Sequence, residues 1–175
     1  MSTIDLVVLG ILLQGAKNAY ELVRYIRERE IHRVLKVSEP AVFKSCRRLA
    51  EAGYLDGETV HEPGVPDKVV YEVNSRGRAR FDELMGHFVQ DFRPFYLEIN
   101  AVLWNIGLVD QAEGKRLLLS LQQQLHAAKT WVTAHEQEVR EILPFGPRQI
   151  VKQYGMTLSA LSDWIDQAVD DYELD

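Results

Sequence analysis

A heptad repeat in the second half of the chain is the feature that most restricts its fold. Apolar side chains recur there at alternating steps of three and four residues for more than three heptads, the spacing of a buried helical seam. The repeat consists of Leu118, Leu121, Leu125, Ala128, Val132, His135, Val139 and Ile142. Such a segment predicts one long helix, from about Asp110 to Leu143, that needs a partner surface along its length.

A second long helix with the same pattern is predicted after the break Pro144-Phe145-Gly146-Pro147. Its apolar positions are Val151, Tyr154, Leu158, Leu161, Ile165, Ala168 and Tyr172. Two seams of this length indicate a homodimer. The residues that we expect to contribute to it are Leu118, Leu121, Leu125, Val132, Val139, Leu158, Leu161 and Ile165. The alternative is antiparallel packing of these two helices within one chain. His135 interrupts the first seam, where a lone polar residue usually sets register, although a ligand group or a pH switch is the other interpretation.

The first half of the chain predicts three helices in succession. The first covers residues 4–14 and is apolar almost all round, which is typical of a buried helix. The second begins at Asn18, with Glu21 in the position of a capping-box partner. The third begins at Ser38, a good N-cap residue, and ends before Gly53.

The third helix has an apolar face and a basic face. Val42, Cys46 and Leu49 share one side at about 100° per residue, which predicts that this side is buried. The opposite side carries basic side chains, and small residues lie at its N-terminal end. A helix of this kind fits the major groove of DNA, where Arg and Lys pair with guanine edges or phosphates. The residues predicted to contact DNA are Ser38, Ala41, Lys44, Arg47 and Arg48. The alternative is an ordinary amphipathic helix with a solvated face.

A β-hairpin is predicted to follow the third helix. Thr59–Glu62 and Lys68–Val73 read as two short strands joined by the turn-rich residues 63–67. Three helices and a hairpin make a winged helix-turn-helix, so the fold class is mainly α with a small β-hairpin. Lys68, at the base of the hairpin, is predicted to contact a phosphate; alternatively, it is an edge charge that deters strand aggregation. Asn74 or Ser75 then begins a fourth helix.

The charge is distributed unevenly between the two predicted domains, residues 1–80 and residues 81–175. The chain carries a net charge of -6. Residues 1–80 hold 13 Lys and Arg against 11 Asp and Glu, a net of +2, whereas residues 81–175 hold 7 against 15, a net of -8. This asymmetry indicates a different partner for each half; the alternative is two ordinary solvated surfaces.

Several segments together resemble PadR-type transcriptional regulators. They are Leu9-Gly10-Ile11-Leu12, Asn18-Ala19-Tyr20-Glu21-Leu22, Val42-Phe43-Lys44-Ser45-Cys46-Arg47-Arg48-Leu49, Ala52-Gly53-Tyr54-Leu55 and the wing end from Val70 to Arg78. The resemblance implies a dimeric, operator-binding regulator, usually a repressor, whose C-terminal helices form the dimer. The sequence departs from the family at Asn18-Ala19, where His-Gly is usual, and at Phe43, where Tyr is common. The second departure removes a hydroxyl that could contact a phosphate.

An effector site between the two halves is also expected, with Tyr96 and Trp104 as its residues. Large aromatic side chains at a dimer seam can line an apolar pocket, and related regulators often release DNA when they bind aromatic compounds. The alternative is that the tryptophans, which include Trp131 and Trp164, serve only in core or interface packing.

Catalytic and metal chemistry are not indicated by the sequence. The five histidines show no metal-ligand spacing, and no phosphate-binding loop or nucleophile elbow is present, so we expect no enzyme, metal or cofactor. Cys46 lies on the apolar face of the third helix and is expected to be a core residue. The longest apolar run, Leu6–Leu13, is too short for a membrane span, and the N-terminus does not resemble a secretory signal; a cytoplasmic protein is expected.

Two functions remain open at this stage. The first is a regulator that binds double-stranded DNA, acts as a homodimer on an inverted-repeat operator, usually as a repressor, and is released by a small aromatic effector. The second is a winged-helix protein-interaction module without operator binding, because a fold does not determine a function. The basic face of the third helix favours the first.

Overall fold

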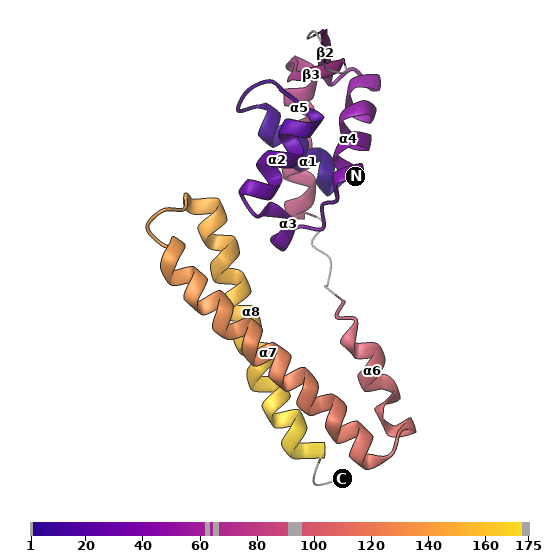
Figure 1. The fold of residues 1–175 in the computed structure, drawn as a ribbon, viewed down its shortest axis with the longest axis vertical. Helices are drawn as coiled ribbons and strands as arrows, with labels where there is room; N and C mark the ends of the chain where they lie inside the picture. The colour runs from indigo at the N-terminus through magenta and orange to yellow at the C-terminus, as the bar shows by residue number, and fades with distance from the viewer. Residues whose placement is uncertain (1, 62–63, 65–66, 91–95, 173–175) are drawn as a thin grey trace. The chain divides into compact units, whose positions relative to one another are not determined.

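The computed structural model describes residues 2–61, 64, 67–90 and 96–172. The chain divides into two compact units, residues 1–94 and residues 95–175. Figure 1 shows the helices and strands of both. Each unit has its own hydrophobic core, so each is described separately.

Helices form most of the first unit. Capping fixes where the second helix begins: the Asn18 side chain accepts a hydrogen bond from the Glu21 N–H at 3.0 Å, and the Glu21 carboxylate accepts one from the Asn18 N–H at 2.8 Å. This reciprocal pair is a capping box, as the sequence predicts. The helices are α1 (Thr3–Leu12), α2 (Ala19–Glu28), α3 (Ile31–Val34), α4 (Glu39–Glu51) and α5 (Ser75–Gln90). The short α3 lies between the second and third predicted helices, where the sequence analysis expected no helix.

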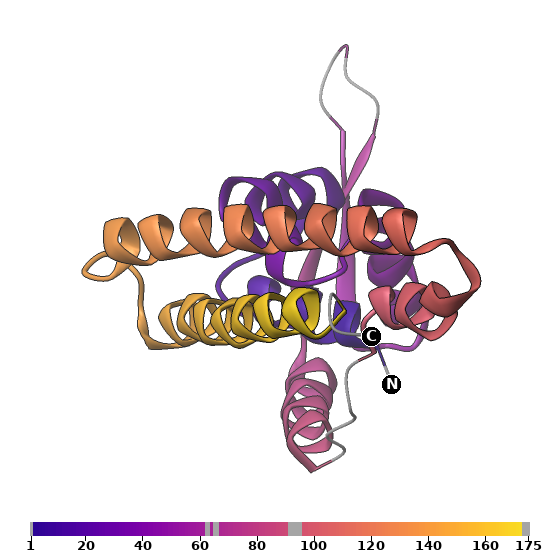
Figure 2. The same ribbon diagram turned by 90° about the horizontal axis from the view of Figure 1, so that it is seen from below.

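A three-stranded antiparallel sheet joins these helices, in the order β1-β3-β2. β1 is Lys17–Asn18, β2 is Leu55–Val60 and β3 is Lys68–Val73. Figure 2 shows the β2–β3 hairpin extending from the helices of its unit. The predicted bounds of β3 are confirmed. The strand predicted at Thr59–Glu62 is present, but its bounds are shifted: β2 overlaps the prediction at Thr59 and Val60, because pairing with β3 runs from Leu55 to Val60. Glu62, Pro63, Val65 and Pro66 lie outside the described residues.

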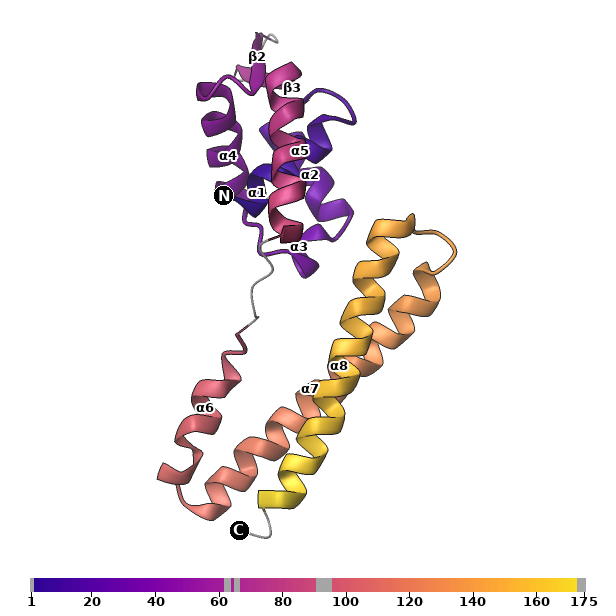
Figure 3. The same cartoon turned by 180° about the vertical axis from the view of Figure 1, so that it is seen from behind.

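The core of the first unit fixes the orientation of α4. Val42, Cys46 and Leu49 are at most 2% exposed, which confirms the predicted apolar face. They pack with Val8 and Leu9 of α1, which are fully buried. Figure 3 shows α5 beside α1. The face of α4 opposite this core therefore points to solvent.

The second unit is built around a helical hairpin. After α6 (Ile99–Asn105) and a short 3-10 helix η1 (Ile106–Leu108), α7 (Gln111–Val139) and α8 (Phe145–Tyr172) pack side by side and antiparallel. Asp110 caps α7 by accepting a hydrogen bond from the Glu113 N–H at 2.8 Å. Leu118, Ile165 and Val169 form the buried centre of this unit.

Much of the predicted heptad seam is filled by contacts within the chain. Leu118 and Ile165 are buried in the hairpin core, and Leu121 and Leu125 pack against it. Val132 is also buried, at 6% exposed. The other residues that were predicted to contribute to the dimer, Val139, Leu158 and Leu161, are half-buried. Antiparallel packing of α7 on α8 therefore occurs within one chain, as the alternative interpretation allows.

None of the helices in the described part of the chain is long and apolar enough to cross a membrane.

Candidate nucleic-acid interface

Helix α4 carries three exposed cations, and two of them, Lys44 and Arg47, lie on its solvent face. Lys44 and Arg47 are exposed, whereas Val42 and Cys46, on the opposite side of the same turns, are fully buried. Ser38 is exposed at the start of the helix and Ala41 is half-buried. The structure thus places these four predicted DNA-contact residues on or beside one accessible helix face. Among them, the long cationic side chains of Lys44 and Arg47 have the reach that groove contacts require.

Arg48 differs from the other predicted contacts because it is bonded to a buried acid. Its Nη2 donates a hydrogen bond to the Oδ1 of Asp5, on α1, and the Ser45 hydroxyl donates to the same oxygen. The Asp5 side chain is only 10% exposed, while that of Arg48 is 47% exposed. Both donors of this Asp5 cluster lie on α4, so the cluster fixes the rotation of α4 relative to α1. The sequence analysis did not identify Asp5.

Ser38 occupies the N-cap position of α4, but its side chain makes no capping hydrogen bond. The predicted start of the helix is therefore right, while the expected role of the hydroxyl is not observed. Pro40 in the first turn is compatible with this start, because that turn has N–H groups without helical partners anyway.

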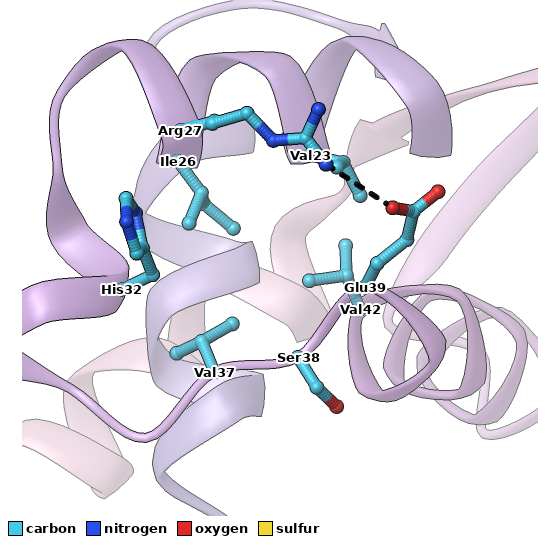
Figure 4. Close-up of a pocket in the computed structure, with 8 residues that line it drawn as sticks. All are labelled: Val23, Ile26, Arg27, His32, Val37, Ser38, Glu39 and Val42. Carbon is cyan, nitrogen blue, oxygen red and sulfur yellow. Dashed lines mark hydrogen bonds and ion pairs between the residues drawn. The ribbon is translucent and has the colours of Figure 1, made fainter.

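A small pocket lies between α2 and the beginning of α4, and Figure 4 shows the residues that line it. Val23, Ile26 and Val42 are part of its apolar lining. An ion pair between Arg27 and Glu39, at 3.4 Å, crosses its edge. Its volume of about 200 Å³ is below the range of about 300–1,000 Å³ that is usual for small-molecule sites. We assign no ligand to it.

The hairpin places Lys68 at the first residue of β3, opposite Val60 of β2. Lys68 is half-buried. Close to the tip, the His61 Nδ1 and the Asp67 Oδ1 are 2.6 Å apart, and both side chains are exposed. Lys68 therefore lies at the tip end of the two strands and not at the base of the hairpin as predicted, and it is next to a His–Asp pair that the sequence analysis did not identify.

Cys46 has the environment of a core residue and not of a nucleophile. Its side chain is fully buried, and burial raises the pKa of its thiol to about 11. The phenol of Tyr71, on β3, also has a raised pKa because of burial, partly offset by the positive charge of Arg47. Arg47 therefore lies close enough to β3 for its charge to act on Tyr71.

The two residues predicted for an effector site lie on the surface of the second unit. Tyr96 and Trp104 are each 90% exposed. On α7, Trp131 stacks on His135 with ring centroids 5.2 Å apart and planes 9° apart. Trp164 packs against the hairpin core. The three tryptophans therefore have different surroundings, and Trp104 is the most exposed.

These features define a class of protein. Three helices, a hairpin wing, a recognition-type helix with a basic outer face and a following helical hairpin form the architecture of a winged-helix DNA-binding protein. Residues 8–83 match the model of the Transcriptional regulator PadR-like family. The first unit of the chain thus resembles PadR-like transcriptional regulators.

Solved structures share this fold across both units. PadR from Bacillus subtilis in complex with operator DNA is 13% identical, with a TM-score of 0.79 over 98% of each chain. The same protein in complex with p-coumaric acid gives 12% identity and a TM-score of 0.74, over 100% of this chain and 99% of that one. The virulence activator AphA of Vibrio cholerae gives 17% and 0.67, over 98% and 99%. A comparison with curated protein sequences gave no match.

Proposed function

We propose that this protein binds double-stranded DNA sequence-specifically through α4. In this proposal it acts as a homodimer on an inverted-repeat operator and represses transcription from it. The observation that carries the proposal is the exposed pair Lys44 and Arg47 on a helix whose opposite face is buried. A rigidly held helix presents its outer side chains in a fixed register, which base reading requires. The operator complex of the B. subtilis relative supports this use of the fold.

The residues of the interface have different tasks in this proposal. Arg47 pairs with a base edge, because its planar guanidinium can make two parallel hydrogen bonds to guanine. Lys44 neutralises phosphate or contacts a base, and Ser38 and Ala41 allow close approach at the start of the helix. Arg48 holds α4 through Asp5 and uses its remaining donors toward DNA. Lys68 of the wing contacts the backbone.

A homodimer is proposed from the apolar surface of the second unit. Although α7 and α8 pack on each other, Trp104, Leu108 and Met156 are 90%, 83% and 66% exposed. Large apolar side chains that a small helical unit leaves exposed favour a protein contact. A second copy of this chain is the partner that an inverted-repeat site requires, since a two-fold protein mirrors a two-fold operator.

An aromatic effector is the least direct part of the proposal. Tyr96 and Trp104 offer exposed rings, and the B. subtilis relative forms a complex with p-coumaric acid. For release, such a compound must bind the DNA-free arrangement better than the DNA-bound one, because equal affinity for both shifts nothing.

The test is a binding titration with the DNA upstream of the protein's own gene, at fixed salt, followed by anisotropy of a labelled duplex. Changing Lys44 and Arg47 together to alanine removes two charges from α4 and is expected to abolish specific binding. The matched control changes Arg148 and Lys152 of α8, which are also exposed and also carry two charges. Loss in the first variant alone supports the proposal. Equal binding of both variants would contradict the proposal and would favour the alternative function, a winged-helix protein-interaction module without operator binding.

A further inference from the structure

Tyr20 is an aromatic side chain exposed beside the recognition helix. It lies at the second position of α2 and is 68% exposed, whereas its neighbour Ala19 is buried. Its ring packs edge-on against Phe43 of α4, with centroids 4.9 Å apart and planes 78° apart. Phe43 lies one helical turn before Arg47, so the two side chains are neighbours on α4. Tyr20 is therefore held next to the proposed DNA-binding face.

The hydroxyl of Tyr20 makes no hydrogen bond within the described part of the chain. This distinguishes it from Tyr25 on the same helix, whose hydroxyl donates to Gln14 Oε1 at 3.0 Å. The acid next to Tyr20, Glu21, accepts a hydrogen bond from the Asn18 N–H, and this holds its carboxylate at the helix cap. The Tyr20 hydroxyl is thus an exposed donor whose ring is fixed by packing.

We propose that the Tyr20 hydroxyl donates a hydrogen bond to a DNA backbone phosphate and that Phe43 positions it for this contact. The inference rests on the proposed function, that α4 binds in the major groove. In a helix-turn-helix the helix before the recognition helix crosses the DNA backbone, and tyrosine hydroxyls are among the usual phosphate donors. Phe43 has no hydroxyl, so Tyr20 supplies the hydroxyl in this pair of packed rings.

The test compares Tyr20→Phe with Tyr25→Phe in the full-length protein. Both variants remove one hydroxyl from α2, and Tyr20→Phe keeps the ring that packs on Phe43. We expect Tyr20→Phe to weaken binding about three- to tenfold, equally for operator and for unrelated duplex, because a phosphate contact carries no base information. The dependence of affinity on salt should not change, because a neutral donor releases no counterion. Tyr25→Phe should bind as wild type does.

A double-mutant cycle tests the role of Phe43. In a Phe43→Leu background the effect of Tyr20→Phe should fall below about twofold, because the ring contact that fixes the hydroxyl is gone. An undiminished effect would show that Phe43 does not position Tyr20. Wild-type affinity in Tyr20→Phe would overturn the phosphate contact while leaving operator binding intact. If the wild-type protein binds no duplex, the proposed function itself fails, and this inference fails with it.

Discussion

Arg47 and Arg48 are adjacent in sequence but have different surroundings. Arg47 points to solvent, whereas Arg48 is bonded to the Asp5 cluster. Asp5 is nearly buried, and a buried carboxylate without its partner is costly. If the proposed function holds, removal of Arg47 therefore affects mainly the affinity for DNA, whereas removal of Arg48 also affects the free energy of unfolding.

We expect Arg48→Ala to lower the free energy of unfolding by about 1–3 kcal/mol, because it leaves the Asp5 carboxylate with Ser45 as its remaining donor in the cluster. Arg47→Ala should leave stability within about 0.5 kcal/mol of wild type, because it is an exposed surface change. Its operator affinity should fall by about 1–3 kcal/mol if it reads a base edge. Urea denaturation and DNA titration of both variants measure these two quantities. Equal stability of the two variants would show that the Asp5 cluster contributes nothing.

The thiol of Cys46 allows a prediction about pH. Burial favours the neutral thiol and raises its pKa from 9.0 to about 11. Because the unfolded chain ionises first, the contribution of this group to stability is full below about pH 9 and is lost as the pH rises from about 9 to about 11. A thiol reagent at pH 8 should therefore react with Cys46 slowly in the folded protein and rapidly in urea. Fast reaction without denaturant would mean that Cys46 is accessible.

At the scale of elements, the contact between α5 and the start of β2 depends on one glycine. Gly77 is buried in the first turn of α5, and a Cβ at this position would overlap the carbonyl oxygen of Tyr54. Backbone cannot move aside as a flexible side chain can. The close approach of α5 to Tyr54 therefore requires a residue without a Cβ.

We expect Gly77→Ala to destabilise the protein by about 3 kcal/mol or more, because α5 must shift from the core. Gly86→Ala, on the same helix, is the matched control, since nothing lies within 4 Å of its Cβ position. It should raise stability by about 0.5–1 kcal/mol through its better helix propensity. Thermal unfolding followed by circular dichroism measures both changes. A stability of Gly77→Ala close to that of Gly86→Ala would contradict the close approach.

Local patterns predict part of this fold because they depend on neighbouring residues. The capping box at Asn18 and the buried face of α4 follow from spacing alone, and both are confirmed. β1 was missed, since it has two residues and is defined by backbone pairing with distant Tyr71 and Val70. Asp5 was missed for a similar reason, since 43 residues separate it from Arg48. A heptad pattern also does not specify which chain supplies the partner, so the sequence left the packing of α7 on α8 as an alternative to a dimer.

At the scale of the whole molecule, the proposed homodimer depends on side chains that the second unit leaves exposed. We expect Leu108→Glu to give a monomer of 20.1 kDa in sedimentation and to weaken operator binding, because a charge cannot be buried unpaired in the interface. Leu108 is 83% exposed, so the change costs little stability within the chain. Val89→Glu, at a residue 79% exposed in the first unit, is the control and should remain dimeric. A wild-type chain that sediments as a monomer at micromolar concentration would contradict the proposal.

The proposed effector should change the emission of Trp104. This side chain is 90% exposed, so binding of an aromatic compound next to it changes its contact with water. We expect phenolic or planar cationic compounds to quench the fluorescence of wild type but not of Trp104→Phe, and to weaken operator binding by about 1–3 kcal/mol. Compounds that quench both proteins equally act elsewhere, at Trp131 or Trp164. If no compound quenches emission or weakens binding, the effector proposal is wrong.

The bond between Arg48 and Asp5 limits how the DNA preference of such a regulator can change. A change of Arg48 is expected to alter the stability of the protein as well as the proposed DNA contact, so selection for a new operator could not vary this position freely. Lys44 and Arg47 have no such restriction among the contacts described above. A library that randomises these two positions together with Ala41, and keeps Asp5, Ser45 and Arg48, should yield more folded variants with new specificities than one that randomises the whole helix face.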